Sequence, residues 1–272
     1  MLRKAFVYIV LSPLLIFSPQ WTSQVQDDFY PAPLLASAPE AATEDVASGE
    51  EITEDQLDDD SKNFLENNLI DSVEQKTNII LSVPFVAQAP FGEWSEPRFQ
   101  DGCEETSALI AMSWAKGEKE ISKEDAKKEI LAIADFEKEK YGTYRDTSAS
   151  DTIARILEAY FDYHAAELKK DIEINDIIAE LEKGNSLIVP CDGQKLKNPF
   201  FTVPGPDRHM LVIIGYDYET KEFITNDPGT RQGKSFRYPE ERLYFALRDY
   251  PSGEHLPIIG ESKVMIVLVK SL

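Results

Sequence analysis

The chain has 272 residues, of which 42% are hydrophobic, so it is long enough to bury a sizeable core in one or two domains. Its 28 basic and 49 acidic residues give a net charge of −21, which repels phosphate backbones and argues against nucleic acid as a partner. Two Cys and three His residues are too few for a disulfide framework and offer few ligands for a zinc cluster.

The first 21 residues have the layout of a secretory signal. Arg3 and Lys4 precede an apolar run of 13 residues, 5–17, which is shorter than the roughly 20 residues of a membrane-spanning helix. We therefore predict that residues 1–21 are a signal peptide or an N-terminal membrane anchor, which places the rest of the chain outside the cytoplasm. A buried N-terminal strand or helix is the alternative interpretation.

Residues 22–75 form a strongly acidic segment. They contain 15 Asp or Glu residues and one Lys, a net charge of −14, whereas residues 76–272 carry −9. Such a composition cannot bury enough apolar surface to order itself. We predict a disordered linker that tethers a folded domain, residues 76–272, to the membrane. A solubilising acidic tail has the same composition.

The folded region shows helical periodicity first and strand patterns later. The predicted helices are 103–115, 123–140 with Ser122 as N-cap, a segment from Ser148 or Ser150 to about 163, 172–184 and 239–248. The predicted strands are 78–83, 164–168, 186–190 ended by Pro190, and 263–269, together with a hairpin of 209–217 and 221–227. This order predicts an α+β fold with an antiparallel sheet.

Three residues could form a nucleophilic centre. Cys103 begins a predicted helix, where the backbone N–H groups and the helix dipole favour a thiolate. His209 begins a predicted strand and could accept the thiol proton, and Asp227 ends the partner strand and could orient the imidazole. The residues themselves also allow a structural interpretation, because a lone Cys in an apolar helix is usually a small buried side chain.

Cys191, at the end of a predicted strand, has no assigned base and is expected to be inert. A disulfide between Cys103 and Cys191 in an oxidising compartment is the alternative. That bond would consume the nucleophile and indicate a structural or redox role.

The strings VPFVAQAPFGEW, DGCEETSALIAM, RHMLVIIGYD and ITNDPG occur in this order. They resemble the papain-like peptidase domain that accompanies bacteriocin exporters, and especially its stand-alone, secreted branch. The resemblance covers about residues 76–250 and implies a papain-like fold, with the nucleophile on a central helix packed on an antiparallel sheet. It implies that Cys103 is the nucleophile, His209 the general acid and base, and Asp227 the orienting group. Gln88 would donate to the oxyanion beside the backbone N–H of Cys103. No cofactor or metal is implied.

The sequence departs from the family pattern directly after the nucleophile. The family usually has Gly there, but this chain has Glu104, followed by Glu105. Two carboxylates beside a thiol oppose its ionisation, although they suit a helix N-terminus.

Two of these residue roles have an alternative candidate. Gln88 precedes Cys103 by 15 residues, a longer interval than in the exporter-linked domains, so Gln100 is an alternative oxyanion donor. Asn226 lies next to Asp227, and a shift of one residue in strand register would exchange their roles.

The loop before Cys103 carries two aromatic residues, Phe91 and Trp94. They could line a substrate cleft, but aromatic residues next to Pro more often cover the edge of a core.

The pattern as a whole predicts an extracytoplasmic thiol hydrolase with a Cys-His-Asp triad, acting on a peptide or protein substrate or on another amide. A second hypothesis is a surface-displayed binding domain that keeps the fold and holds a peptide or cell-wall fragment uncut. A third is an acyl transferase, in which an amine resolves the acyl enzyme in place of water. The transferase would use the same triad as the hydrolase, whereas the binding domain would use only the fold and its cleft.

Overall fold

The computed structural model describes residues 76–270. The predicted signal segment and acidic linker, residues 1–75, lie outside the described residues. None of the helices within residues 76–270 is both long and apolar enough to cross a membrane. The elements in chain order are β1 (Ile79–Ile80), α2 (Pro97–Gln100), α3 (Cys103–Ala115), α4 (Lys123–Tyr141), α5 (Ala149–Asp151), the π-helical η2 (Thr152–Glu158), β2 (Ala166–Lys170), α6 (Ile174–Glu182), β3 (Ser186–Cys191), α7 (Gly193–Leu196), β4 (His209–Asp217), β5 (Glu222–Asn226), β6 (Phe236–Pro239), α8 (Glu240–Ala246) and β7 (Val264–Leu268).

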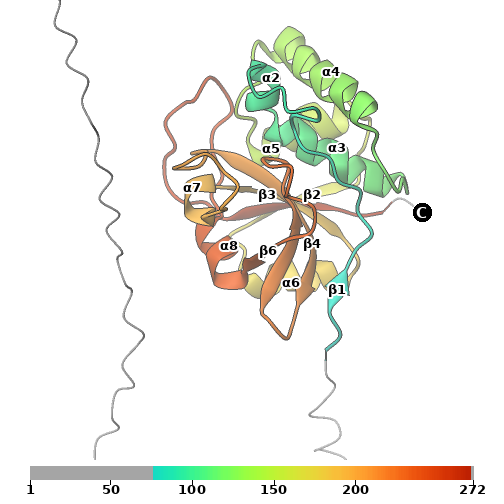
Figure 1. The fold of residues 1–272 in the computed structure, drawn as a ribbon, viewed down its shortest axis with the longest axis vertical. Coiled ribbons are helices and arrows are strands. Elements are labelled where there is room, and N and C mark those ends of the chain that lie inside the picture. The colour runs from blue at the N-terminus through green and yellow to red at the C-terminus, as the bar shows by residue number, and fades with distance from the viewer. Residues whose placement is uncertain (1–75, 271–272) are drawn as a thin grey trace, which may run out of the picture. The chain divides into compact units, whose positions relative to one another are not determined.

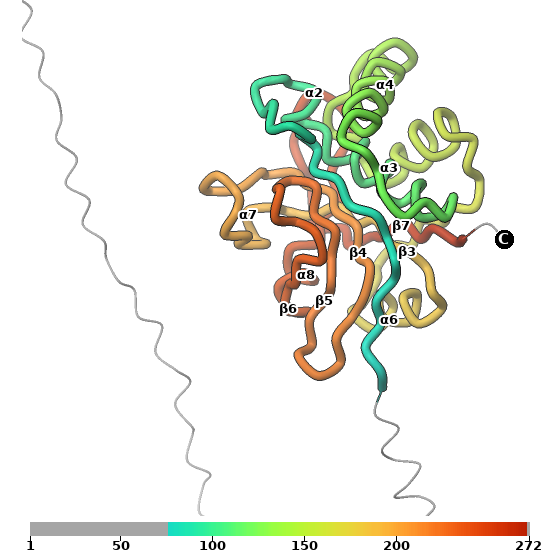
Figure 2. The backbone as a smooth tube through the Cα atoms, turned by 45° about the vertical axis from the view of Figure 1, so that its right-hand side comes forward, coloured from blue at the N-terminus to red at the C-terminus, as the bar shows by residue number. Residues whose placement is uncertain are grey.

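The described strands form one antiparallel sheet in the order β2-β7-β3-β4-β5-β6. β1 pairs with the far end of β4, beyond the part of β4 that pairs with β3. From there the chain runs along the sheet towards α2 (Figure 2). The predicted α+β fold with an antiparallel sheet is therefore confirmed.

Helices cover both faces of the sheet (Figure 1). β4 shows why its sequence is a continuous apolar run. Met210 and Val212 belong to the core shared with α3, α4 and η2, whereas Leu211 and Ile213 belong to the core shared with α6 and α8. Successive side chains of a strand point to opposite faces, so a strand covered on both sides needs apolar residues at every position.

α4 follows its sequence signals closely. The Ser122 side chain accepts the N–H of Asp125 at the helix start, and Gly142, with φ of 87°, ends the helix in the left-handed conformation. The buried side of the helix is apolar apart from one carboxyl, that of Glu137. The predicted bounds, 123–140, are confirmed to within one residue.

The prediction that Pro190 ends its strand was wrong, because β3 continues to Cys191 and Pro190 pairs with Met210. The Pro190 carbonyl accepts the N–H of Arg248, in the segment after α8. In an antiparallel strand the N–H and C=O of one residue point the same way. The N–H that proline lacks would therefore face that segment, and no hydrogen bond to β4 is lost.

Other predicted elements differ in length. The helix predicted to reach about residue 163 ends at Glu158 and is π-helical from Thr152, with Ser148 as its cap. The predicted strand 78–83 pairs over two residues only. α2, α7 and β6 have four residues each and were not predicted, because such elements are too short to show a period.

Candidate active site

Cys103 is the first residue of α3, directly after Gly102. All 13 residues of this helix are buried, and the helix packs on β3 and β4 of the sheet, which fixes the backbone position of Cys103. The N–H groups of the first turn have no partner within a helix and point towards its N-terminal end. They give this end of α3 a partial positive charge.

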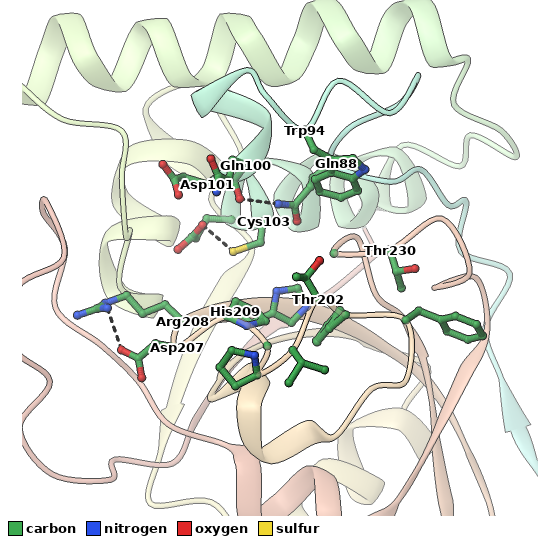
Figure 3. Close-up of a pocket in the computed structure, with 18 of the residues that line it drawn as sticks. Gln88, Trp94, Gln100, Asp101, Cys103, Thr202, Asp207, Arg208, His209 and Thr230 are labelled. Carbon is green, nitrogen blue, oxygen red and sulfur yellow. Dashed lines mark hydrogen bonds and ion pairs between the residues drawn. The ribbon is translucent and has the colours of Figure 1, made fainter. Parts of the chain in front are cut away.

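The N-terminal end of α3 opens into a pocket of about 640 Å³. Figure 3 shows Cys103 and His209 on opposite walls of this pocket. One wall comes from the loop before α3 and the start of α3, and the other from the segment before β4 and the loop after β5. The lining residues are Gln88, Trp94, Gln100, Asp101, Cys103, Glu104, Asp146, 200–209, 229–232 and His255.

His209 and Asp227 are joined by a hydrogen bond of 2.7 Å between Nε2 and Oδ1, and both side chains are buried. The other carboxyl oxygen of Asp227 accepts the Tyr238 hydroxyl at 2.6 Å and the Asn198 amide at 3.2 Å. The N–H of Gly229 donates to Oδ1 at 3.0 Å. Since Nε2 is engaged by Asp227, Nδ1 is the ring nitrogen left to exchange a proton in the pocket.

The Asp227 carboxyl is kept ionised by its partners. Burial by itself would raise its pKa, but the neighbouring His209 and the hydrogen bonds from His209, Tyr238 and Gly229 outweigh burial and lower the pKa. An ionised Asp227 fixes the imidazole orientation and stabilises the cation that forms when His209 takes up a proton.

The Cys103 thiol is neutral in this arrangement. Burial raises its pKa well above the ordinary value, and the charge of Glu104 and a hydrogen bond to it raise the pKa further. The thiol donates to Glu104 Oε2 at 2.9 Å, and no hydrogen bond joins it to His209. The start of α3 therefore does not by itself produce a thiolate, and the two carboxylates oppose ionisation as the sequence predicts.

Gln88 lies in the pocket but its amide is already engaged. Its Nε2 donates to the carbonyl oxygens of Phe99 and Gln100, both at 2.9 Å, while its Oε1 is buried without a partner. The long interval between Gln88 and Cys103 is taken up by a loop and α2, which return the chain to the pocket. The oxyanion role of Gln88 stays a prediction, as does that of Gln100, which also lines the pocket.

Asn226 does not contact His209 in this structure. Its amide donates to the carbonyl oxygens of Val83 and Pro84, and its Oδ1 accepts the N–H of Ser235. These contacts tie the end of β5 to the chain that precedes Gln88. The geometry thus brings Asp227, and not Asn226, to the imidazole.

The two aromatic residues before α3 lie in different places. Trp94 lines the pocket, whereas Phe91 is not part of the lining and its ring lies beside Lys123 and Lys127, each 5.8 Å from the ring centroid. Phe91 therefore packs against the start of α4.

Cys191 and Cys103 are both free, and they belong to cores on opposite faces of the sheet. A disulfide between them would have to pass through the sheet. Burial raises the pKa of the Cys191 thiol well above its ordinary value. Within residues 76–270 no group of three or more His, Cys, Asp or Glu side chains is arranged to hold a metal ion.

Comparison with known proteins assigns most of the chain to a family. Residues 80–250 match the model of the Peptidase_C39-like family. The chain belongs to this family. A crystal structure of a protein assigned as a C39-like peptidase from Bacillus anthracis matches with a TM-score of 0.46 and 17% sequence identity, covering 72% of this chain and 99% of that chain. A comparison with curated proteins finds no match.

Family membership gives this Peptidase_C39-like protein a cysteine peptidase-like function and a papain-like α+β fold. Two residues that hold Asp227 in this peptidase-like site, Asn198 and Tyr238, were missed in the sequence. Phe236 and Tyr238 alternate with the charged Arg237 in FRYP, a short strand pattern that could have placed Tyr238 beside β5, but nothing in the sequence marks Asn198.

Gly229 is predicted to set the position of the catalytic candidate His209 in this Peptidase_C39-like site. A Cβ at Gly229 would lie 2.8 Å from His209 Cε1 and 3.0 Å from Phe201 Cε1, so Gly229→Ala should displace the imidazole. We expect peptide hydrolysis to fall by about 10²-fold, the scale of a misplaced catalytic group. Gly117→Ala is the control, because it strains a turn that has open space around it. Equal loss in both variants would contradict a local effect on His209.

Proposed function

We propose that this chain is an extracytoplasmic cysteine peptidase that cleaves a peptide or other amide bond with Cys103, His209 and Asp227. The observation that carries the proposal is the buried His209–Asp227 pair, which faces a pocket lined by Cys103. The nucleophile begins a helix, the base has one nitrogen fixed and one left for proton transfer, and the pocket is large enough for part of a peptide. Family membership supports the same reaction class.

In the proposed reaction the thiol proton moves to His209 Nδ1 while the sulfur electron pair forms a bond to the substrate carbonyl carbon. The carbonyl π electrons move to oxygen, which would accept hydrogen bonds from the backbone N–H of Cys103 and from the Gln88 amide, once that amide leaves the carbonyl oxygens of Phe99 and Gln100. Collapse of this intermediate breaks the C–N bond, and the leaving amine takes the proton from His209. Water then attacks the thioester, with His209 again acting as the base, and releases the acid.

The extracytoplasmic setting is supported by the sequence of residues 1–21, with its cationic start and apolar run. The same residues would attach the protein to a membrane if they are retained. A peptide or protein outside the cytoplasm is then the substrate class.

The proposal is tested by incubating the full chain with a mixture of peptides of diverse sequence and identifying products by mass spectrometry. The wild type should release a defined set of products, and Cys103→Ala should lower their rate of formation at least about 10³-fold. Cys191→Ala is the matched control, because it removes the other buried thiol and should leave the products unchanged. Cleavage that survives Cys103→Ala would overturn the proposal.

A binding domain is the second candidate, and one observation favours it. The Cys103 thiol is neutral and engaged by Glu104, which is the opposite of a preformed thiolate. If that candidate is correct, the peptide mixture stays uncut while some peptides co-elute with the protein.

A further inference from the structure

The Cys103 thiol is part of a buried hydrogen-bonded chain that the proposed reaction does not use. The thiol donates to Glu104 Oε2 at 2.9 Å, and the Tyr250 hydroxyl donates to Glu104 Oε1 at 2.7 Å. The three side chains are 6%, 1% and 3% exposed, respectively. Both oxygens of the Glu104 carboxyl are therefore occupied by neutral donors that come from its own helix and from the segment after α8. We call Cys103, Glu104 and Tyr250 the thiol latch.

Glu104 has no cationic partner to compensate for its charge. No ion pair within residues 76–270 includes Glu104, and Arg208, which lines the same pocket, is paired with Asp146 and Asp207. Burial raises the pKa of Glu104, and the hydrogen bonds that its carboxyl accepts from the thiol and the phenol oppose this rise by favouring the ionised form. Ionising the thiol while it faces Glu104 would remove one of these donors and place two anions in contact.

We propose that Glu104 is a positioning residue that holds the Cys103 thiol protonated and turned away from His209 until substrate enters. This inference rests on the proposed function and adds regulation of the same site. For attack, the sulfur must leave Glu104 and face Nδ1 of His209, which is free because Nε2 is bonded to Asp227. The S–H proton then passes to Nδ1 as the S–C bond forms, while Glu104 keeps the hydrogen bond from Tyr250.

Other titratable groups near the thiol latch either also oppose ionisation of the Cys103 thiol or are uncharged. Burial raises the pKa of Glu105 well above its ordinary value, and Glu105 adds less to the raised pKa of the Cys103 thiol than burial and Glu104 do. Tyr250 is likewise kept neutral, because burial and the charge of Glu104 raise its pKa well above its ordinary value. The titratable groups that face the thiol or the Glu104 carboxyl are Glu104, Glu105, Asp146, His209 and Tyr250.

The latch is tested by the pH dependence of iodoacetamide alkylation at Cys103, in the full chain with Cys191→Ser so that a single thiol reacts. Iodoacetamide reacts with the thiolate, so the midpoint of the rate profile reports the thiol pKa. Glu104→Gln should lower this midpoint by about one pH unit and raise the rate near pH 7 about tenfold. Tyr250→Phe should shift the midpoint in the same direction by less, because Glu104 loses a donor and is protonated more readily.

Glu105→Gln is the matched control, since it replaces the neighbouring buried carboxyl, which forms no hydrogen bond with the thiol. It should shift the alkylation midpoint by less than Glu104→Gln does, because Glu105 adds less than Glu104 to the raised pKa of the thiol. An unchanged midpoint in both Glu104→Gln and Tyr250→Phe would overturn the latch. Peptide hydrolysis by the same proteins separates this inference from the proposed function. A shifted midpoint without any cleavage refutes the peptidase alone, whereas cleavage with an unmoved midpoint refutes the latch alone.

Discussion

Replacing His209 by Ala should lower the rate of peptide hydrolysis by about 10²–10⁴-fold, the usual contribution of a positioned acid–base group. The reason is that the Cys103 thiol is neutral, so attack depends on a base that removes its proton during bond formation. His209 is placed for this role by its hydrogen bond to Asp227, which leaves Nδ1 for the thiol. Initial rates on a peptide cleaved by the wild type give the measurement.

The pocket supplies a matched control for this prediction. His255 also lines it, but its ring is half-exposed and its Nδ1 is paired with Asp146 at 2.8 Å. His255→Ala should change the rate by no more than a few fold, because its ring is half-exposed to solvent, whereas His209 and its partner Asp227 are both buried. A similar loss of activity in His255→Ala and His209→Ala would argue against the assigned base.

Glu137→Gln should stabilise the protein at pH 8 and leave its stability near pH 4.5 almost unchanged. Glu137 on α4 and Glu105 on α3 are both fully buried, and neither oxygen of Glu105 has a hydrogen-bond partner. Burial raises the pKa of Glu137 to about 8, although the hydroxyl of Thr147 donates to it at 3.0 Å. Burial also raises the pKa of Glu105 well above its ordinary value, and the charge of Glu137 adds to the effect.

The sign of this effect follows from counting protons. Between about pH 4.5 and pH 8 the unfolded chain has released the Glu137 proton while the folded chain still holds it. The folded state then binds more protons, so the free energy of unfolding falls as pH rises, by up to ~1.4 kcal/mol per pH unit for each such proton. Glutamine cannot ionise, so the substitution removes the contribution of this carboxyl to the slope.

Urea unfolding of the wild type and Glu137→Gln at pH 4.5, 6 and 8 measures the slope. Glu139→Gln is the control, because Glu139 is an exposed residue of the same helix. The free energy of unfolding of this variant should match that of the wild type at every pH. Parallel curves for the wild type and Glu137→Gln would show that the buried carboxyl is ionised, or solvated, in the folded protein.

The sequence predicted the elements that carry their own local signals. Ser122 and Gly142 bound α4 through capping, and the start of α3 at Cys103 and the β4–β5 hairpin follow from apolar periodicity and turn residues. The hairpin also brought His209 and Asp227 together as predicted, because strand register decides which residues of paired strands meet. Their chemical roles stay a prediction that the experiments above test.

What the sequence did not reveal depends on contacts between distant segments. Tyr250 meets Glu104 across 146 positions, and Tyr238 and Asn198 reach Asp227 from a strand and a loop with no motif. The state of the thiol follows from such contacts. A cysteine at a helix start predicts a thiolate, but burial and the carboxyl of the next residue reverse that effect.

The central claim is that Cys103 is the nucleophile of a peptidase. The most direct test treats the full chain carrying Cys191→Ser with iodoacetamide, and follows alkylation of Cys103 and peptide hydrolysis in the same samples over time. Activity should be lost in one-to-one proportion to alkylated Cys103. A fully alkylated protein that still cleaves peptide at its original rate, or an untreated protein that cleaves none, would contradict it.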